Sequence, residues 1–302
     1  MKSMIRRLVL TCISLIIFSC SEKDIIEDSN ELYILPVVVH IIHNGETKGM
    51  GNNLSNDRIF QQIETLNSDF RKKKGTLGYS NDPLAGDAKI EFRLAEIDPS
   101  GQPTNGITRV NAQEVEYDIE EGGWFFDYLP HYAYWDDSKY LNIWVFPFEP
   151  NIILGQASMP RANLPGLTNS DTTGTTGVMI TTAHFGEFDV EGGSNLGRSL
   201  THEMGHFLGL EHLWGKVEYA QCTEYDDYCK DTPYVSSRTG SCKNTSNDIC
   251  DSSPVLIHNY MDYTDDICMN MFTHDQIRRM RFVIENSISR HLLTISPVIS
   301  RN

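Results

Sequence analysis

Basic residues are scarce in this sequence. The chain of 302 residues has 25 lysines and arginines against 41 aspartates and glutamates, which gives a formal net charge of −16 at pH 7. A protein that binds nucleic acid needs basic patches to neutralise phosphates, so nucleic acid is not an expected partner. The acidity suits a soluble surface, and it also suits carboxylates that bind calcium or a basic substrate.

Long apolar runs are lacking as well. The run from Leu8 to Phe18 follows a basic amino terminus and is too short to span a bilayer as a mature helix. It predicts an export signal over residues 1–19. The signal ends at a segment that resembles a bacterial lipobox, in which Cys20 would be lipidated; ordinary cleavage nearby is the alternative. We therefore expect an exported protein, either a cell-surface or outer-membrane lipoprotein or a secreted protein, that touches a membrane only through this anchor.

The segment after the signal, residues 20–32, is polar and acidic. This composition is typical of a tether or a short pro-segment. Apolar periodicity then predicts a buried strand over Leu35–Ile42 and an amphipathic helix over residues 55–73. His40 and His43 are interpreted as structural residues of this first strand region. Further strands are expected over residues 88–97, 140–146 and 178–182, so the order of elements indicates an α/β (α+β) domain.

The segment SLTHEMGHFLGLEH, which begins at residue 199, carries the decisive pattern. On a helix, positions i and i+4 share a face, so His202 and His206 can bind one metal ion with Glu203 beside them. Gly209 lets the chain leave the helix, and His212 can then return as a third ligand. Three protein ligands leave a position for water, as in catalytic zinc sites. The spacing is that of metzincin proteases, in which the glutamate acts as general base.

A second pattern lies about fifty residues further on, at Asn259-Tyr-Met-Asp-Tyr263. It resembles the Met-turn of metzincins, in which Met261 would support the zinc-binding histidines from below. Tyr263 matches a tyrosine that in several metzincins stabilises the oxyanion. The alternative interpretation of Tyr263 is a buried tyrosine whose hydroxyl is hydrogen-bonded.

Longer stretches of the chain resemble the pappalysin family of metzincins over residues 33–285. These stretches are HNYMDYTDDICMNMFTHDQIRRM (258–280), WDDSKYLNIWVF (135–146), LGQASMP (154–160) and DTPY (231–234). The resemblance implies a catalytic domain over residues 33–290. Its upper subdomain, 33–212, would hold a twisted, mostly parallel five-stranded sheet with two long helices. Its lower subdomain, 213–290, would be irregular and disulfide-bonded, and residues 291–302 would form a C-terminal tail.

The same resemblance implies that the active-site cleft runs between the two subdomains. Residues 154–158 would form the edge strand that pairs with an extended substrate. It favours disulfides between Cys222 and Cys250 and between Cys242 and Cys268, which leaves Cys229 unpaired and suits an oxidising compartment. No C-x-x-C spacing occurs among these cysteines, which argues against a second zinc site.

Calcium is a second expected cofactor. The family commonly binds calcium in the lower subdomain, and here Asp226, Asp231 and Thr232, with Asp227 between them, are the candidate ligands. A solvated acidic loop is the alternative, because the spacing is not that of an EF-hand.

Together these observations predict a monomeric, zinc-dependent endopeptidase that hydrolyses peptide bonds in proteins or peptides. A water activated by zinc and Glu203 would attack the peptide carbonyl, and Glu203 would pass the proton to the departing amine. The alternative is a catalytically silent surface lipoprotein that keeps the metzincin fold for binding. Glu203 argues against it, since a purely structural zinc site needs no glutamate there.

Overall fold

The computed structural model describes residues 30–116, 125–147, 153–168, 175–188, 193–216, 226–243 and 255–300. The predicted signal and the lipidation candidate Cys20 lie outside these residues. Within them, no helix combines the length and the apolar character that crossing a membrane requires.

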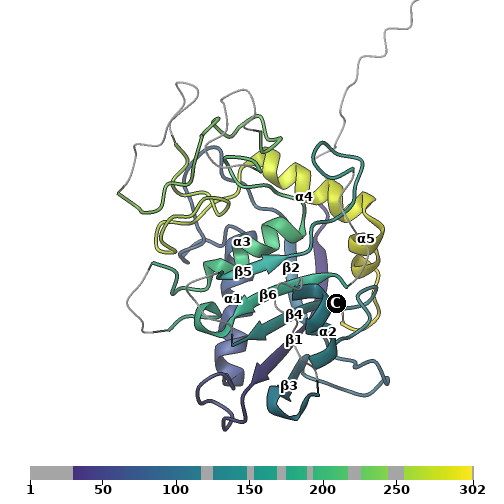
Figure 1. The fold of residues 1–302 in the computed structure, drawn as a ribbon. Helices are drawn as coiled ribbons and strands as arrows, with labels where there is room; N and C mark the ends of the chain where they lie inside the picture. The colour runs from purple at the N-terminus through teal and green to yellow at the C-terminus, as the bar shows by residue number, and fades with distance from the viewer. Residues whose placement is uncertain are drawn as a thin grey trace, which may run out of the picture.

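A mostly parallel sheet forms the centre of the fold (Figure 1). Its strands are β1 (Tyr33–His43), β2 (Ile90–Leu94), β3 (Ile107–Asn111), β4 (Leu141–Phe146), β5 (Gly155–Ala157) and β6 (Gly177–Thr181). The order is β2-β1-β4-β6-β5, and β5 alone runs antiparallel, against β6. The predicted fold class is therefore confirmed, and the strand of residues 154–158 lies at the end of the sheet order.

The sheet has six strands rather than the five expected, because β1 is long enough to pair with two partners on one side. Residues Tyr33–Val37 pair with β2, and residues Val39–His43 pair with β3. Strand β3 escaped prediction because its five residues, ITRVN, have no continuous apolar pattern and are all half-buried.

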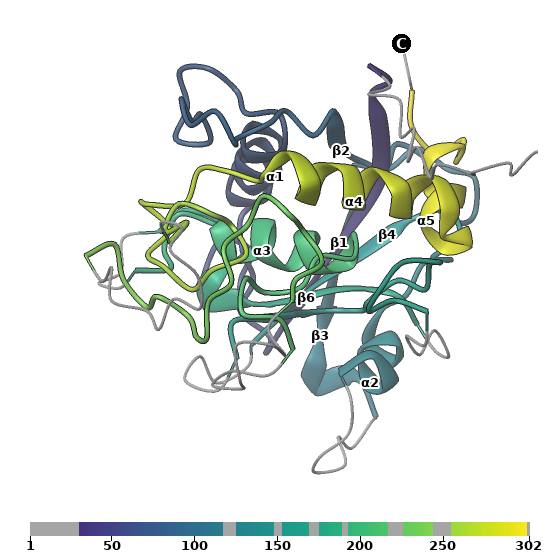
Figure 2. The same ribbon diagram turned by 90° about the horizontal axis from the view of Figure 1, so that it is seen from above.

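Helices cover both faces of the sheet. They are α1 (Asn56–Phe70), α2 (Phe125–Tyr132), α3 (Arg198–Phe207), α4 (His274–Asn286) and α5 (Ile288–Thr294), with two short 3-10 turns at Ala112–Glu114 and Thr182–His184. Seen from above, α1, α3 and α4 lie on one side of the sheet and α2 on the other (Figure 2). The main core joins α1, α3 and α4 to the sheet, and a smaller apolar cluster joins α2 to β4 and β6.

Helix α1 begins where the sequence predicts it, because the hydroxyl oxygen of Ser55 accepts the backbone N–H of Arg58 at 3.2 Å. It buries Ile59, Leu66 and Phe70 against the sheet. The helix ends at Phe70, three residues earlier than expected.

The C-terminal helices are the largest departure from the predicted irregular lower subdomain. Helix α4 begins with a capping box between Thr273 and Gln276 and buries Met280 in the main core. Helix α5 crosses the expected domain end at residue 290. The following segment, expected as a tail, packs back on the sheet, where the carbonyl of Val298 accepts the N–H of Glu96 at 2.8 Å.

His40 is a buried residue of β1 with both ring nitrogens hydrogen-bonded, as its structural interpretation requires. Its Nδ1 lies 2.6 Å from Oγ1 of Thr108, and its Nε2 lies 2.9 Å from Oδ1 of Asn142. Burial lowers the pKa of His40 to about 4.

We expect Met280→Ala to reduce the free energy of unfolding by about 2–5 kcal/mol, because it opens a cavity beneath α4 where Met280 is fully buried. Ile288→Ala on α5 is the control: this side chain is 79% exposed, and its loss should cost less than about 0.5 kcal/mol. Urea unfolding at constant metal concentration measures both. Equal effects of the two changes would contradict the packing of α4 on the core.

The buried neutral His40 predicts a pH dependence of stability. Below pH 6.5 the unfolded chain takes up a proton on this ring while the folded chain does not, so stability falls as the pH drops towards 4. The shift from 6.5 to about 4 corresponds to about 3 kcal/mol. The free energy of unfolding of His40→Gln should fall less over the same pH range, because glutamine does not take up a proton. Parallel stability curves for the two proteins between pH 7 and 4 would refute it.

Candidate active site

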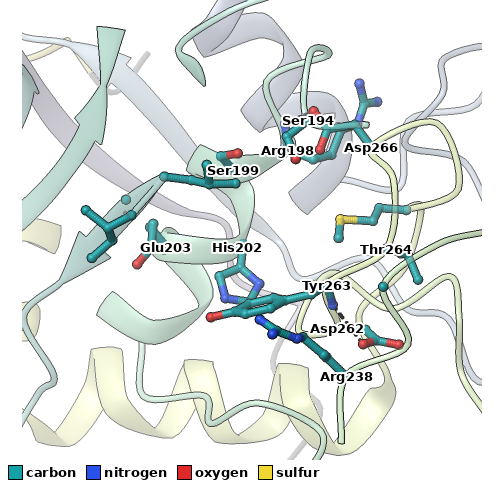
Figure 3. Close-up of a pocket in the computed structure, with 15 residues that line it drawn as sticks. Ser194, Arg198, Ser199, His202, Glu203, Arg238, Asp262, Tyr263, Thr264 and Asp266 are labelled. Carbon is teal, nitrogen blue, oxygen red and sulfur yellow. Dashed lines mark hydrogen bonds between the residues drawn. The ribbon is translucent and has the colours of Figure 1, made fainter. Parts of the chain in front are cut away.

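Helix α3 carries the first part of the site on its buried face. Leu200 and Met204 anchor it in the main core beneath the sheet's end. His202 and His206, one turn apart, therefore point to the same side of the helix, and Glu203 lies next to His202. Figure 3 shows Glu203 and His202 projecting from this helix into the pocket.

The chain leaves α3 through Gly209, whose φ of +91° is a left-handed conformation that favours glycine. A Cβ at this position would lie 2.8 Å from Cδ1 of Leu167. The turn returns His212 to the helix face. As a result, Nε2 of His206 lies 3.1 Å from Nε2 of His202 and 3.1 Å from Nε2 of His212. These three histidines are the one group of potential metal ligands found among the described residues.

The tautomers of two histidines follow from their hydrogen bonds. Nδ1 of His202 lies 2.7 Å from the carbonyl of Tyr260, and Nδ1 of His206 lies 2.7 Å from the carbonyl of Leu210. A carbonyl only accepts, so each Nδ1 carries the proton and each Nε2 presents a lone pair. Burial lowers the pKa of His202 to about 3 and of His206 to about 4, which keeps both rings neutral.

These nitrogens fit a tetrahedral metal ion. Nitrogens about 2.05 Å from a zinc ion in tetrahedral geometry are separated by about 3.3 Å, close to the 3.1 Å observed for both pairs. The lone pairs that Nε2 of His202 and Nε2 of His206 direct at each other repel unless a cation lies between them. The donor set, three neutral imidazoles, suits zinc.

Glu203 lies between α3 and the edge strand. A Cβ at Gly155 of β5 would lie 2.7 Å from Cγ of Glu203, so only glycine allows the strand to approach this closely. Burial raises the pKa of Glu203 to about 8. A divalent cation next to this carboxyl would lower that pKa and favour the carboxylate. Glu203, His202 and Tyr263 line one pocket of about 540 Å³.

The Met-turn candidate lies directly beneath α3. Met261 is fully buried, and a side chain at Gly205 would collide with its sulfur. Gly205 separates the two histidines of the helix, so Met261 supports the backbone that carries them. Tyr263 lies across the pocket, with its ring centroid 5.2 Å from that of His202 and 4.9 Å from that of His212. It is 41% exposed, so it is not a buried core tyrosine.

Several supporting residues were not predicted. The Trp214 ring stacks on His212 with centroids 4.4 Å apart and 12° between the planes. Asp69 at the end of α1 accepts the hydroxyl of Thr201 at 2.7 Å and so holds the first turns of α3. Arg279 of α4 donates its Nε–H to the carbonyl of Gly209 at 2.7 Å. Trp214 directly follows the zinc pattern, but no local signal marks the other contacts, because their partners are distant in sequence.

The acidic loop of the lower subdomain is closed by its own hydrogen bonds. Asp226 accepts the N–H of Tyr228 at 2.6 Å, and Oδ1 of Asp227 accepts the hydroxyl of Thr232 at 2.8 Å. Asp231 accepts the N–H of Asp275 at 2.9 Å through Oδ2. Two buried oxygens, Oδ2 of Asp227 and Oδ1 of Asp231, have no hydrogen-bond partner among the residues that the structure describes.

The cysteines follow the expected pattern as far as the structure describes them. Cys242 and Cys268 form a disulfide with their Cα atoms 5.9 Å apart, and Cys229 is a buried free thiol. Burial holds the pKa of Cys229 far above its usual range. The expected partners Cys222 and Cys250 lie outside the described residues.

Comparison with known proteins places this site in a family. The family model Peptidase_M43, described as pregnancy-associated plasma protein-A, matches residues 129–285. An extracellular metalloprotease of Trichophyton verrucosum is 40% identical over 247 residues, which are 80% of this chain and 74% of that protein. One from Arthroderma otae is 31% identical over 248 residues, with the same two coverages.

Solved structures agree with this. Mature mirolysin of Tannerella forsythia, in complex with a cleaved peptide, superposes with a TM-score of 0.72 and 33% identity over 89% of this chain and 99% of that one. A promirolysin mutant from the same organism gives a TM-score of 0.74 and 34% identity over 90% and 88% of the two chains. The chain therefore belongs to the pappalysin family of metzincin-type metalloproteases, peptidase family M43.

Proposed function

We propose that this metalloprotease is a zinc-dependent endopeptidase in which His202, His206 and His212 hold the zinc ion and Glu203 is the general base. The observation that carries the proposal is the convergence of three imidazole Nε2 atoms beside the buried Glu203, which lines one pocket together with His202. When bound, zinc acts as a Lewis acid that polarises a carbonyl and lowers the pKa of water towards neutrality.

The protein groups supply positioning and proton transfer. The carbonyls of Tyr260 and Leu210 fix two of the imidazole rings with their lone pairs directed inward. Glu203, as a carboxylate, accepts a proton from the attacking water and delivers it to the leaving amine. The hydroxyl of Tyr263 donates a hydrogen bond to the oxygen that becomes negative in the transition state.

Strand β5 supplies the binding surface for the substrate. Within the described part of the chain it pairs only with β6, so its other edge is available to an extended peptide. Gly155 brings this strand against Glu203, which places a peptide paired to β5 next to the general base. The cleaved peptide in the mirolysin complex supports a peptide substrate.

The presence of Glu203 in the pocket favours catalysis over the alternative, a silent binding lipoprotein. Three histidines suffice to bind a zinc ion, so a binding protein has no need of the buried carboxyl of Glu203 beside them. The curated relatives are extracellular metalloproteases, which supports export of this chain, as a lipoprotein anchored at Cys20 or as a secreted monomer.

Calcium binding in the lower subdomain is a further part of the proposal. Oδ2 of Asp227 and Oδ1 of Asp231 support it: both are buried without a partner in the described part of the chain, and buried carboxylate oxygens require a hydrogen bond or a cation. Asp227, rather than Asp226, thus becomes a favoured ligand beside Asp231. The hydroxyl of Thr232 already donates a hydrogen bond to Asp227 within the loop. A disulfide between Cys222 and Cys250 is retained as a prediction.

Glu203→Gln tests the general base. It removes the proton acceptor and leaves the histidines in place, so kcat for peptide cleavage should fall about 10³-fold or more. Zinc content, measured by atomic absorption, should stay at one ion per chain. Glu64→Gln, an exposed glutamate on α1, is the matched control and should retain full activity. Equal activity of the Glu203 variant and the wild type at equal zinc content would refute the assignment.

Tyr263→Phe tests the oxyanion donor. Loss of the hydroxyl should lower kcat about 10²-fold with little change in KM, because the hydrogen bond forms with charge that develops only in the transition state. Steady-state kinetics on one fluorogenic peptide gives both constants. An unchanged kcat would leave Tyr263 with a packing role against the histidine rings.

A further inference from the structure

Arg290 of α5 is completely buried, and its side chain connects two other elements of the fold. Its Nε–H donates to the carbonyl of Phe207 at 2.9 Å, and its Nη2 donates to the carbonyl of Ser158 at 2.8 Å. Its guanidinium also lies 3.5 Å from the centroid of the Phe207 ring. The side chain therefore binds α3 and the residue after β5 by directional hydrogen bonds to both and by a cation–π contact with Phe207.

The two acceptors belong to the two elements that enclose the general base. Phe207 is the last residue of α3 and follows His206, and Ser158 directly follows β5. The same two elements meet again where Gly155 approaches Glu203. Arg290 thus fixes, at one end, the separation between the metal-binding helix and the strand that would pair with substrate.

Burial of this charge is costly. The hydrogen-bond acceptors of Arg290 are neutral oxygens, and burial lowers its pKa to about 9. An apolar side chain would fill the same space without that cost. Only a planar group with several donors can bind both carbonyls at once while stacking on Phe207. A buried guanidinium at this position therefore serves the placement of its two partners rather than packing alone.

We propose that Arg290 is a positioning residue of the peptidase, which holds β5 at a fixed register and distance from α3. A peptide paired with β5 then presents its scissile carbonyl to Glu203 and the three histidines. This inference rests on the proposed function. The contribution of Arg290 to substrate binding grows with the number of substrate residues that pair with β5. A ligand that contacts only the metal site does not use the strand.

Arg281 of α4 provides a matched control. It is buried as well, donates to the carbonyls of Glu31 and Ala88 at 3.0 and 3.1 Å, and lies 4.6 Å from the Tyr33 ring centroid. These contacts hold the starts of β1 and β2, at the other end of the strand order from β5. Arg281→Met therefore removes the same types of interaction away from α3 and β5.

The experiment compares the zinc-loaded wild type, Arg290→Met, Arg290→Lys and Arg281→Met on a nested series of peptides. All peptides share one scissile bond and differ only in the number of flanking residues. In the wild type, kcat/KM should rise with length. In Arg290→Met the longest peptide should lose about 10-fold to 10²-fold in kcat/KM, mainly through KM, while the shortest loses little. Arg290→Lys keeps the charge and the aliphatic stem. In this variant kcat/KM should still rise with peptide length, but less than in the wild type.

Zinc content and inhibition by acetohydroxamate, which is too small to reach β5, should be the same in the Arg290 variants as in the wild type. Arg281→Met should keep the wild-type length profile. A uniform loss over all peptide lengths, or a wild-type profile in Arg290→Lys and in any folded Arg290→Met, would overturn the inference. Absence of zinc or of acetohydroxamate inhibition in the wild type would instead refute the proposed metal site.

Discussion

Mutual repulsion of imidazole lone pairs is the constraint on which the rest of the site depends. Nε2 of His202 and Nε2 of His206, 3.1 Å apart, cannot donate to each other, because the opposite nitrogen of each ring donates to a backbone carbonyl. Left to themselves, the rings would rotate or separate. The surrounding fold must therefore supply enough rigidity to keep the cation site assembled, and much of the chain near the site serves this purpose.

That rigidity comes from three directions. Met261 fills the space beneath Gly205 and supports α3 from below. Asp69 binds Thr201 and the guanidinium of Arg198, which holds the first turn of α3 against the end of α1. The C-terminal helices hold the other end of α3 through arginine contacts to backbone carbonyls. These supports place α3, and the carbonyls of Tyr260 and Leu210 then fix the rings of His202 and His206.

The sequence predicted those features whose cause is local. The apolar run of β1, the serine cap of α1 and the histidine spacing of α3 each depend on neighbouring residues and periodicity. The sixth strand and the packed C terminus escaped because distant contacts stabilise them: β3 exists through β1, and the segment at Val298 through the residues after β2. Helix α4 does carry a local signal, the capping box of Thr273 and Gln276, but the lower subdomain was expected to be irregular. The same reason applies within the site. Glu203 is visible in a short pattern, whereas Arg279 is 70 residues from the Gly209 carbonyl it binds.

The disulfide between Cys242 and Cys268 has a consequence for when the site is complete. The two cysteines are 26 positions apart, and the chain between them includes the Met-turn and the pocket residues Asp262, Tyr263, Thr264 and Asp266. Closure of this loop removes conformational freedom from the segment in every state of the chain. Disulfides form in oxidising compartments. The wall opposite α3 is therefore covalently fixed only after the chain has reached such a compartment, which couples full assembly of the cleft to the redox state of its surroundings.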